Sequence, residues 1–97
     1  MVKEVLFFNE MAYSAYSQEL AAKLGYTSLM LPNQEFDAAT AAQLYNMYLD
    51  EFQYASEEGF DGVVINEHHN NPLNMMPGIN LIGAILARNM KKGRIVL

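Results

Sequence analysis

The sequence predicts an α/β protein built on parallel strands, and three observations support this class. Residues 5–8, 63–66 and 94–97 are runs rich in β-branched and aromatic side chains that do not alternate with polar ones. Such runs are typical of parallel strands covered on both faces, although a short buried helix looks similar. Helical patterns lie between them, and 63–97 reads as strand, loop, helix and strand over roughly 35 residues, the length of a right-handed βαβ unit.

The composition describes one small folded domain. Hydrophobic residues make up 52% of the 97 residues and charged residues 18%. This balance excludes a disordered tail, because disorder needs fewer apolar groups and more charge. A chain of this length buries only about two-thirds of its unfolded surface, so we expect marginal stability.

Charge and cysteine content restrict the partners and the compartment. The formal net charge is -5, so we expect no nucleic-acid partner, because that interface needs a broad positive face. The sequence has no cysteine, which fits a reducing compartment. The apolar run 5–8 is too short for a signal peptide or a membrane span, and we therefore expect a cytoplasmic protein with no membrane partner.

The segment after the first strand, residues 9–36, is longer than an ordinary connection between a strand and a helix. It contains a short predicted helix from Ser17 to Leu24, which Gly25 closes. Long connections at strand exits usually carry function.

The first long helix is predicted to begin near Asp37 or Thr40 and to run to about Glu58. Either residue can accept hydrogen bonds from the free N–H groups of the first turn. Gly59 tolerates left-handed dihedral angles and ends the helix. The apolar stripe of this helix follows helical spacing. It consists of Leu44, Tyr48, Phe52 and Ala55.

The second long helix is predicted over 77–90, with Pro77 in its first turn and Gly93 beyond its end. Basic residues near its C-terminus complement the helix dipole, which explains the only basic grouping of the chain. These residues are Arg88, Lys91 and Lys92. The expected buried face consists of Ile79, Ile82, Ile85 and Leu86.

A polar cluster follows the second predicted strand: Glu67, His68, His69 and Asn70. Ligands and reacting groups gather at the C-terminal ends of parallel strands. Two imidazoles beside a carboxylate can position a group that titrates near neutral pH, so we interpret this cluster as the functional site. A lone loop histidine is more often a plain hydrogen-bonding residue.

A metal site at this cluster is the less favoured alternative. Adjacent residues that leave a strand point to opposite sides, so Glu67 and His69 can converge while His68 faces elsewhere. No further His or Cys exists in the sequence to complete a tetrahedral shell. We therefore expect no metal.

Other features carry less information. Met75 and Met76 are candidates for lining an apolar pocket, although methionine more often fills gaps in a core. Tyr13, Tyr16 and Tyr26 either cover a cavity mouth or pack over the end of the sheet. The glycines form no phosphate-binding fingerprint.

Three motifs of the chain carry a family resemblance: Leu44-Tyr45-Asn46-Met47-Tyr48-Leu49-Asp50-Glu51, Glu58-Gly59-Phe60-Asp61-Gly62 and Asn66-Glu67-His68-His69-Asn70. With them the chain resembles the N-terminal part of the luciferase-like monooxygenases, a flavin-dependent superfamily. The resemblance covers nearly the whole chain, and the combination of the second and third motifs is fairly specific.

The resemblance implies a (β/α)8 TIM barrel that uses reduced flavin and O2 to oxygenate a small organic substrate. FMN is favoured over FAD, a flavin reductase delivers it, and related branches hold the deazaflavin F420. The resemblance assigns His68 as the catalytic acid/base residue beside the flavin. It assigns Glu67, His69 and Asn70 as cofactor-binding neighbours.

The length departs from this family, whose members need several hundred residues. We therefore expect 1–97 to be the N-terminal fragment of one barrel domain, with about three parallel strands and two main helices, inactive and without a tight flavin site on its own. Its open edges should make it a homo-oligomer. Two alternatives remain open: a non-catalytic half-barrel assembly module, and an F420-dependent oxidoreductase of the same fold.

Overall fold

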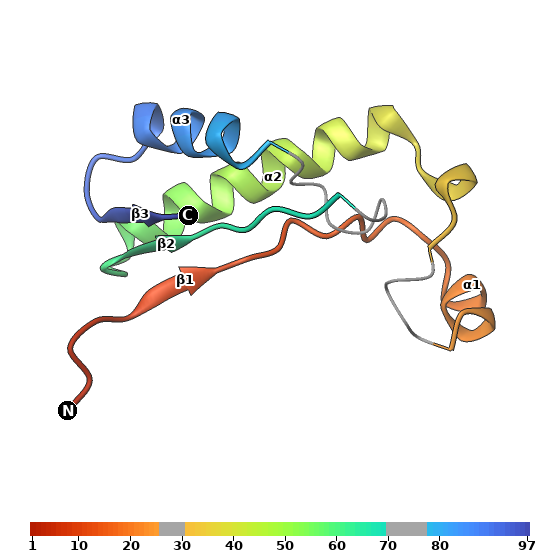
Figure 1. The fold of residues 1–97 in the computed structure, drawn as a ribbon, viewed down its shortest axis with the longest axis horizontal. Helices are drawn as coiled ribbons and strands as arrows, with labels where there is room; N and C mark the ends of the chain where they lie inside the picture. The colour runs from red at the N-terminus through yellow and green to blue at the C-terminus, as the bar shows by residue number, and fades with distance from the viewer. Residues whose placement is uncertain (26–30, 70–77) are drawn as a thin grey trace.

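A three-stranded parallel sheet carries two helices on one face in the computed structural model, which describes residues 1–25, 31–69 and 78–97 (Figure 1). The strands lie in chain order, β1–β2–β3. The α/β class and the parallel pairing are therefore confirmed. The elements are β1 (Leu6–Phe8), α1 (Gln18–Lys23), the 3-10 turn η2 (Asn33–Glu35), α2 (Ala38–Glu57), β2 (Gly62–Val64), α3 (Ile79–Asn89) and β3 (Arg94–Val96).

Side-chain alternation decides which strand residues face the helices. Phe7 of β1 lies in register with Val63 of β2, which pairs with Ile95 of β3. The Phe7 ring packs edge-to-face on Phe52 of α2 with the centroids 5.6 Å apart, and Val63 is fully buried. This row therefore points toward the helices.

The opposite side of the sheet, which we call the helix-free face, is covered by neither α2 nor α3. It carries the next row of the ladder, because successive strand residues point to opposite sides. This row consists of Phe8, Val64 and Val96. Phe8 is 51% exposed. The sequence pattern predicted cover on both faces, whereas the two long helices cover only one.

Helix α2 begins and ends where its sequence signals lie. Asp37 is the N-cap, and its Oδ2 accepts a hydrogen bond of 2.7 Å from the Thr40 backbone N–H. Gly59 has a φ of 107°, so the chain turns there in a conformation that other residues rarely adopt. The predicted stripe faces the sheet: Tyr48, Phe52 and Ala55 are buried.

Helix α3 is shorter than the prediction. It covers Ile79–Asn89, and Pro77 lies outside the described residues. Ile82 and Leu86 are buried as expected. A Cβ at Gly83 would lie 3.3 Å from Leu97 and 3.8 Å from Ile65, so the small residue lets α3 lie close to the sheet.

The strands are also shorter than predicted, because regular pairing stops before the apolar runs end. β1 starts at Leu6 and β2 ends at Val64. The Ile65 N–H still donates to the Val96 carbonyl at 3.0 Å. β3 ends at Val96.

The turn from α2 into β2 links the N-terminal ends of all three strands through hydrogen bonds of Asp61. The Asp61 carboxylate accepts from the Val5 N–H at 2.8 Å, and its own N–H donates to the Val5 carbonyl at 2.9 Å. The Asp61 carbonyl accepts from the Arg94 N–H at 3.0 Å. The Arg94 side chain also pairs with Glu4 at 2.7 Å.

Two buried tyrosines fix the segment between β1 and α2. The Tyr13 hydroxyl accepts from the Asp37 N–H at 3.0 Å, and the Tyr48 hydroxyl donates to the Ala12 carbonyl at 2.7 Å. Tyr13 is 2% exposed, so it belongs to the core and does not line a cavity mouth. Helix α1 lies within the predicted range from Ser17 to Leu24, and Ser17 Oγ caps it by accepting from the Leu20 N–H at 3.1 Å.

We predict that Gly62→Ala destabilises the protein by about 1–3 kcal/mol, the usual cost of overpacking. A Cβ at Gly62 would lie 2.9 Å from the backbone nitrogen of Arg94, so β2 and β3 would have to separate. Urea unfolding followed by circular dichroism measures the change. Gly78→Ala is the steric control, because its Cβ would meet Leu81 at an ordinary 3.8 Å, so it should lose only the smaller difference between Gly and Ala at a helix N-cap. A Gly62→Ala variant as stable as the wild type would contradict the close approach.

The Asp37 cap predicts a pH-dependent stability. The hydrogen bonds from the side chain and the backbone of Thr40 hold the pKa of Asp37 below its ordinary value. The ionised cap therefore stabilises the fold above the ordinary aspartate pKa, and this contribution is lost as pH falls through the lowered pKa.

Thermal melts across acidic and neutral pH should show Asp37→Ala less stable than wild type at neutral pH, with the gap narrowing in acid. Asn caps about as well as Asp, but its amide does not titrate. The difference in stability between Asp37→Asn and Asp37→Ala should therefore stay constant with pH. A gap between wild type and Asp37→Ala that stays constant with pH would contradict the role of the carboxylate.

Candidate functional site

The residues that leave β1 and β2 alternate between the helix side and the helix-free face. After β1, Asn9 turns toward α2, where its Nδ2 donates to Glu51 Oε2 at 2.9 Å. Glu10 points to the other side, toward the residues that follow β2. Met11 has a φ of 51°, and its N–H donates to Asn9 Oδ1 at 2.7 Å. The chain thus turns sharply just after Glu10.

Three side chains meet where β1 and β2 end, and we call them the strand-exit cluster: Glu10, Asn66 and His68. Asn66 Nδ2 donates to Glu10 Oε1 at 3.2 Å and lies 2.9 Å from His68 Nε2. His68 Nε2 is 3.8 Å from Glu10 Oε1. The His68 side chain is 35% exposed, so a ligand can reach the imidazole.

Glu67 and His69 form a separate pair on the side of α3. His69 Nε2 lies 3.6 Å from Glu67 Oε1. The same Glu67 oxygen accepts from the Ile79 N–H at 3.3 Å, at a helix start where the N-cap Gly78 has no side chain to offer. The predicted divergence of His68 from Glu67 and His69 is therefore confirmed, and Glu67 caps α3.

Asn70, the fourth residue of the predicted site, lies outside the described residues, as do Met75, Met76 and Tyr26. Within the described ranges, no group of three or more His, Cys, Asp or Glu side chains is placed to hold a metal ion. The chemistry of the strand-exit cluster is that of a carboxylate, an amide and an imidazole: holding a proton and moving it.

An apolar surface adjoins the strand-exit cluster. Phe8, Val64 and Val96 are the last residues of their strands and lie in register on the helix-free face. The cluster and this row therefore form one surface, polar at the strand exits and apolar next to them. A ligand with an apolar body and polar edge matches such a surface.

Glu10 and Asn66 are the residues of the strand-exit cluster that were not predicted from the sequence as site residues. The available signal was that Asn9-Glu10 directly follows the first strand, as Asn66-Glu67 follows the second. The exits of neighbouring parallel strands meet at one edge of the sheet, so two such polar steps indicate a shared site.

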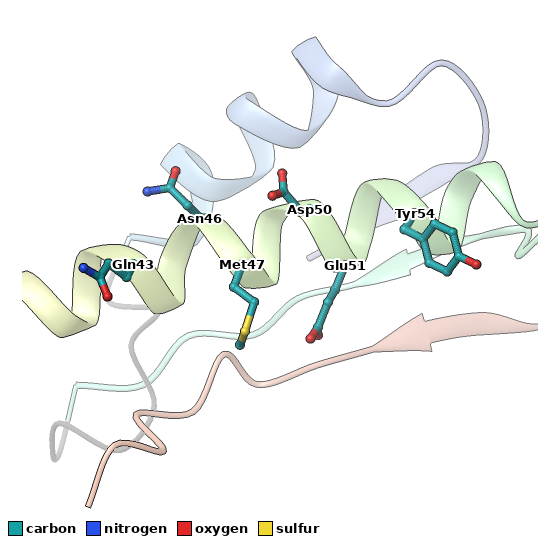
Figure 2. Close-up of a pocket in the computed structure, with 6 residues that line it drawn as sticks. All are labelled: Gln43, Asn46, Met47, Asp50, Glu51 and Tyr54. Carbon is teal, nitrogen blue, oxygen red and sulfur yellow. The ribbon is translucent and has the colours of Figure 1, made fainter.

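Two hollows of the described surface lie along the helices. One, of about 640 Å³, runs along α2 and is lined by Gln43, Asn46, Met47, Asp50, Glu51 and Tyr54 (Figure 2). Another, of about 510 Å³, lies between α2 and α3 and includes Tyr45, Leu49 and Ile82. Burial raises the pKa of the Tyr45 hydroxyl. The lining of the first hollow includes two carboxylates, Asp50 and Glu51, and the lining of the second includes none.

Comparison of the chain with protein-family models, with curated proteins and with solved structures gives no match. Among the described residues, no helix combines the length and the apolar character that crossing a membrane requires.

The cap that Glu67 supplies to α3 gives a local prediction. Glu67→Ala should speed hydrogen exchange of the Ile79 amide about fivefold, because a lost hydrogen bond costs about 1 kcal/mol. Amide exchange measured by NMR reads this directly. The Met90 amide, which donates to Leu86 at the other end of α3, is the internal control; equal acceleration at both ends would mean that the whole helix was loosened.

Proposed function

We propose that this chain supplies the first β/α units and the acid/base residue, His68, of a flavin-dependent luciferase-like monooxygenase. The observation that carries the proposal is the convergence of Glu10, Asn66 and His68 at the C-terminal ends of β1 and β2, on the helix-free face. Active sites of (β/α)8 barrels lie at this end of the strands.

The arrangement of the strands supports a barrel. A sheet that keeps chain order with its connecting helices on one face curls toward closure, whereas a doubly wound sheet has helices on both faces. β1, β2 and β3 lie in chain order, and α2 and α3 pack on the same side (Figure 1). In the proposed barrel, the helix-free face is the interior.

The described residues fit a flavin ring, which has apolar faces and polar edges. The uncovered row that includes Phe8 and Val64 offers apolar surface. His68 and Glu10 offer polar groups, with side chains that are 35% and 48% exposed, respectively. We propose that these residues hold the ring, and that Glu67 and His69 support the site by fixing the start of α3. Asn70 stays in the proposal as their neighbour.

When bound, reduced flavin supplies the electrons for the reaction with O2. His68 holds or delivers a proton at its imidazole, and Asn66 orients that ring. Glu10 Oε1 lies 3.8 Å from Nε2 on the same side of the sheet. Once a flavin ring covers it, the apolar row would exclude water beside these groups. A flavin reductase and a small organic substrate complete the proposed system.

The same uncovered row favours a second candidate, a non-catalytic module that assembles through the helix-free face. Phe8 is 51% exposed, and β1 and β3 are the edges of the described sheet. A second copy of the chain would cover such a surface. An F420-dependent oxidoreductase of the same fold would use the strand-exit cluster in the same place.

We predict that His68→Ala lowers turnover by about a hundredfold or more, the usual contribution of a general acid or base. The full-length chain, as its source produces it, is supplied with reduced FMN and O2 and a panel of small organic compounds, and oxygen consumption is followed. The melting temperature should change little, because the imidazole is partly exposed and packs weakly.

Glu51→Gln is the control and should keep the wild-type turnover, since Glu51 accepts from Asn9 on the helix side, outside the strand-exit cluster. Unchanged turnover in His68→Ala would remove His68 from the mechanism. Reaction with reduced F420 and not with FMN would favour the oxidoreductase, and absence of binding to either flavin would leave the assembly module.

A further inference from the structure

We infer that Glu10 and Asn66 are positioning residues that hold the neutral His68 ring in the tautomer protonated on Nδ1. The catalytic meaning of this inference rests on the proposed function, whereas the tautomer itself follows from three side chains of the strand-exit cluster. Each side chain restricts the next one, and the argument begins with the carboxylate.

Glu10 sets the orientation of the Asn66 amide. An ionised carboxylate only accepts hydrogen bonds, whereas a side-chain amide has one accepting and one donating end. The amide atom that lies 3.2 Å from Glu10 Oε1 must therefore be the donor, Nδ2. A carbonyl oxygen in that place would put two acceptors against each other.

Asn66 in turn sets the tautomer of His68. Nδ2 has two hydrogens, and the same atom that donates to Glu10 lies 2.9 Å from His68 Nε2. A donor on the amide requires an acceptor on the ring, so Nε2 carries its lone pair and the proton is on Nδ1. Free histidine favours the other tautomer, so the protein reverses the intrinsic preference.

The flipped amide is the alternative to consider, because within the described part of the chain Asn66 Oδ1 is buried without a hydrogen-bond donor. After a flip, Oδ1 would accept a proton from His68 Nε2. It would also face the Glu10 carboxylate at 3.2 Å, and the NH2 group would occupy the buried position without an acceptor. The flip therefore exchanges one unsatisfied atom for another and adds a repulsion.

The tautomer decides what His68 offers to a ligand. With Nε2 occupied by Asn66, the neutral ring presents Nδ1–H, a hydrogen-bond donor. The ligand group that it recognises is therefore an acceptor, such as a carbonyl or anionic oxygen.

The test is a long-range proton–nitrogen NMR correlation on the full-length chain with 15N-labelled histidine, under mildly alkaline conditions and without flavin. His68 should show the 15N shift of a protonated nitrogen at Nδ1 and of an unprotonated nitrogen at Nε2. A ring protonated on Nε2, or an even mixture of both tautomers, would overturn the inference.

Two variants test the order of the argument. Asn66→Asp replaces the donor with a carboxylate oxygen and should reverse the pattern, because that oxygen accepts from Nε2–H. Glu10→Gln removes the constraint on the amide with little change in shape and should give a mixture of tautomers. Retention of the wild-type pattern in both variants would mean that neither residue positions the ring.

Glu51→Gln is the matched control, since Glu51 accepts from Asn9 on the helix side and should leave the His68 shifts unchanged. His69 is an internal reference in every spectrum. The measurement is independent of the proposed function: the Nδ1–H tautomer in a chain that neither binds nor oxidises reduced flavin would support the inference and defeat the monooxygenase.

Discussion

The position of β2 between its two neighbours is the constraint on which the rest of the structure depends. Asp61 fixes it by bonding to Val5 before β1 and to Arg94 at the start of β3. Gly62 then lets β3 approach closely, because any side chain there would meet the Arg94 backbone. Once this register is set, alternation places Val63 and Ile65 against the helices and Val64 and Asn66 on the helix-free face.

Much of the architecture could be predicted from the sequence because local signals mark it. Asp37 and Gly59 bound α2 almost where the structure has it, and α1 lies within the range expected from Ser17 to Leu24. The strand ends were less predictable, since Ile65 continues the apolar run beyond regular pairing. The 3-10 turn η2 was not predicted, because its N-cap Pro32 makes no side-chain cap.

Only part of the candidate site could be predicted from the sequence. His68 and its divergence from Glu67 follow from alternation within one strand exit, which is a local property. The contact of Glu10 with Asn66 joins residues 56 positions apart, and it depends on β1 and β2 being neighbours. The capping of α3 by Glu67 likewise needs the spatial course of the chain, since Gly78 is not adjacent to it in sequence.

The alternation after β2 also makes the site sensitive to chain length. The two histidines are consecutive, so one lies on each side of the sheet, each with its own carboxylate: Glu10 for His68 and Glu67 for His69. Deleting Ile65 would move every following residue of the strand exit by one position and would exchange the two imidazoles between the sides. An imidazole, now that of His69, would still lie on the helix-free face, but Asn66 would face the helices and would no longer bridge the ring to Glu10. The second histidine therefore keeps an imidazole on the helix-free face after such a deletion, while the hydrogen-bonded partners distinguish the correct register.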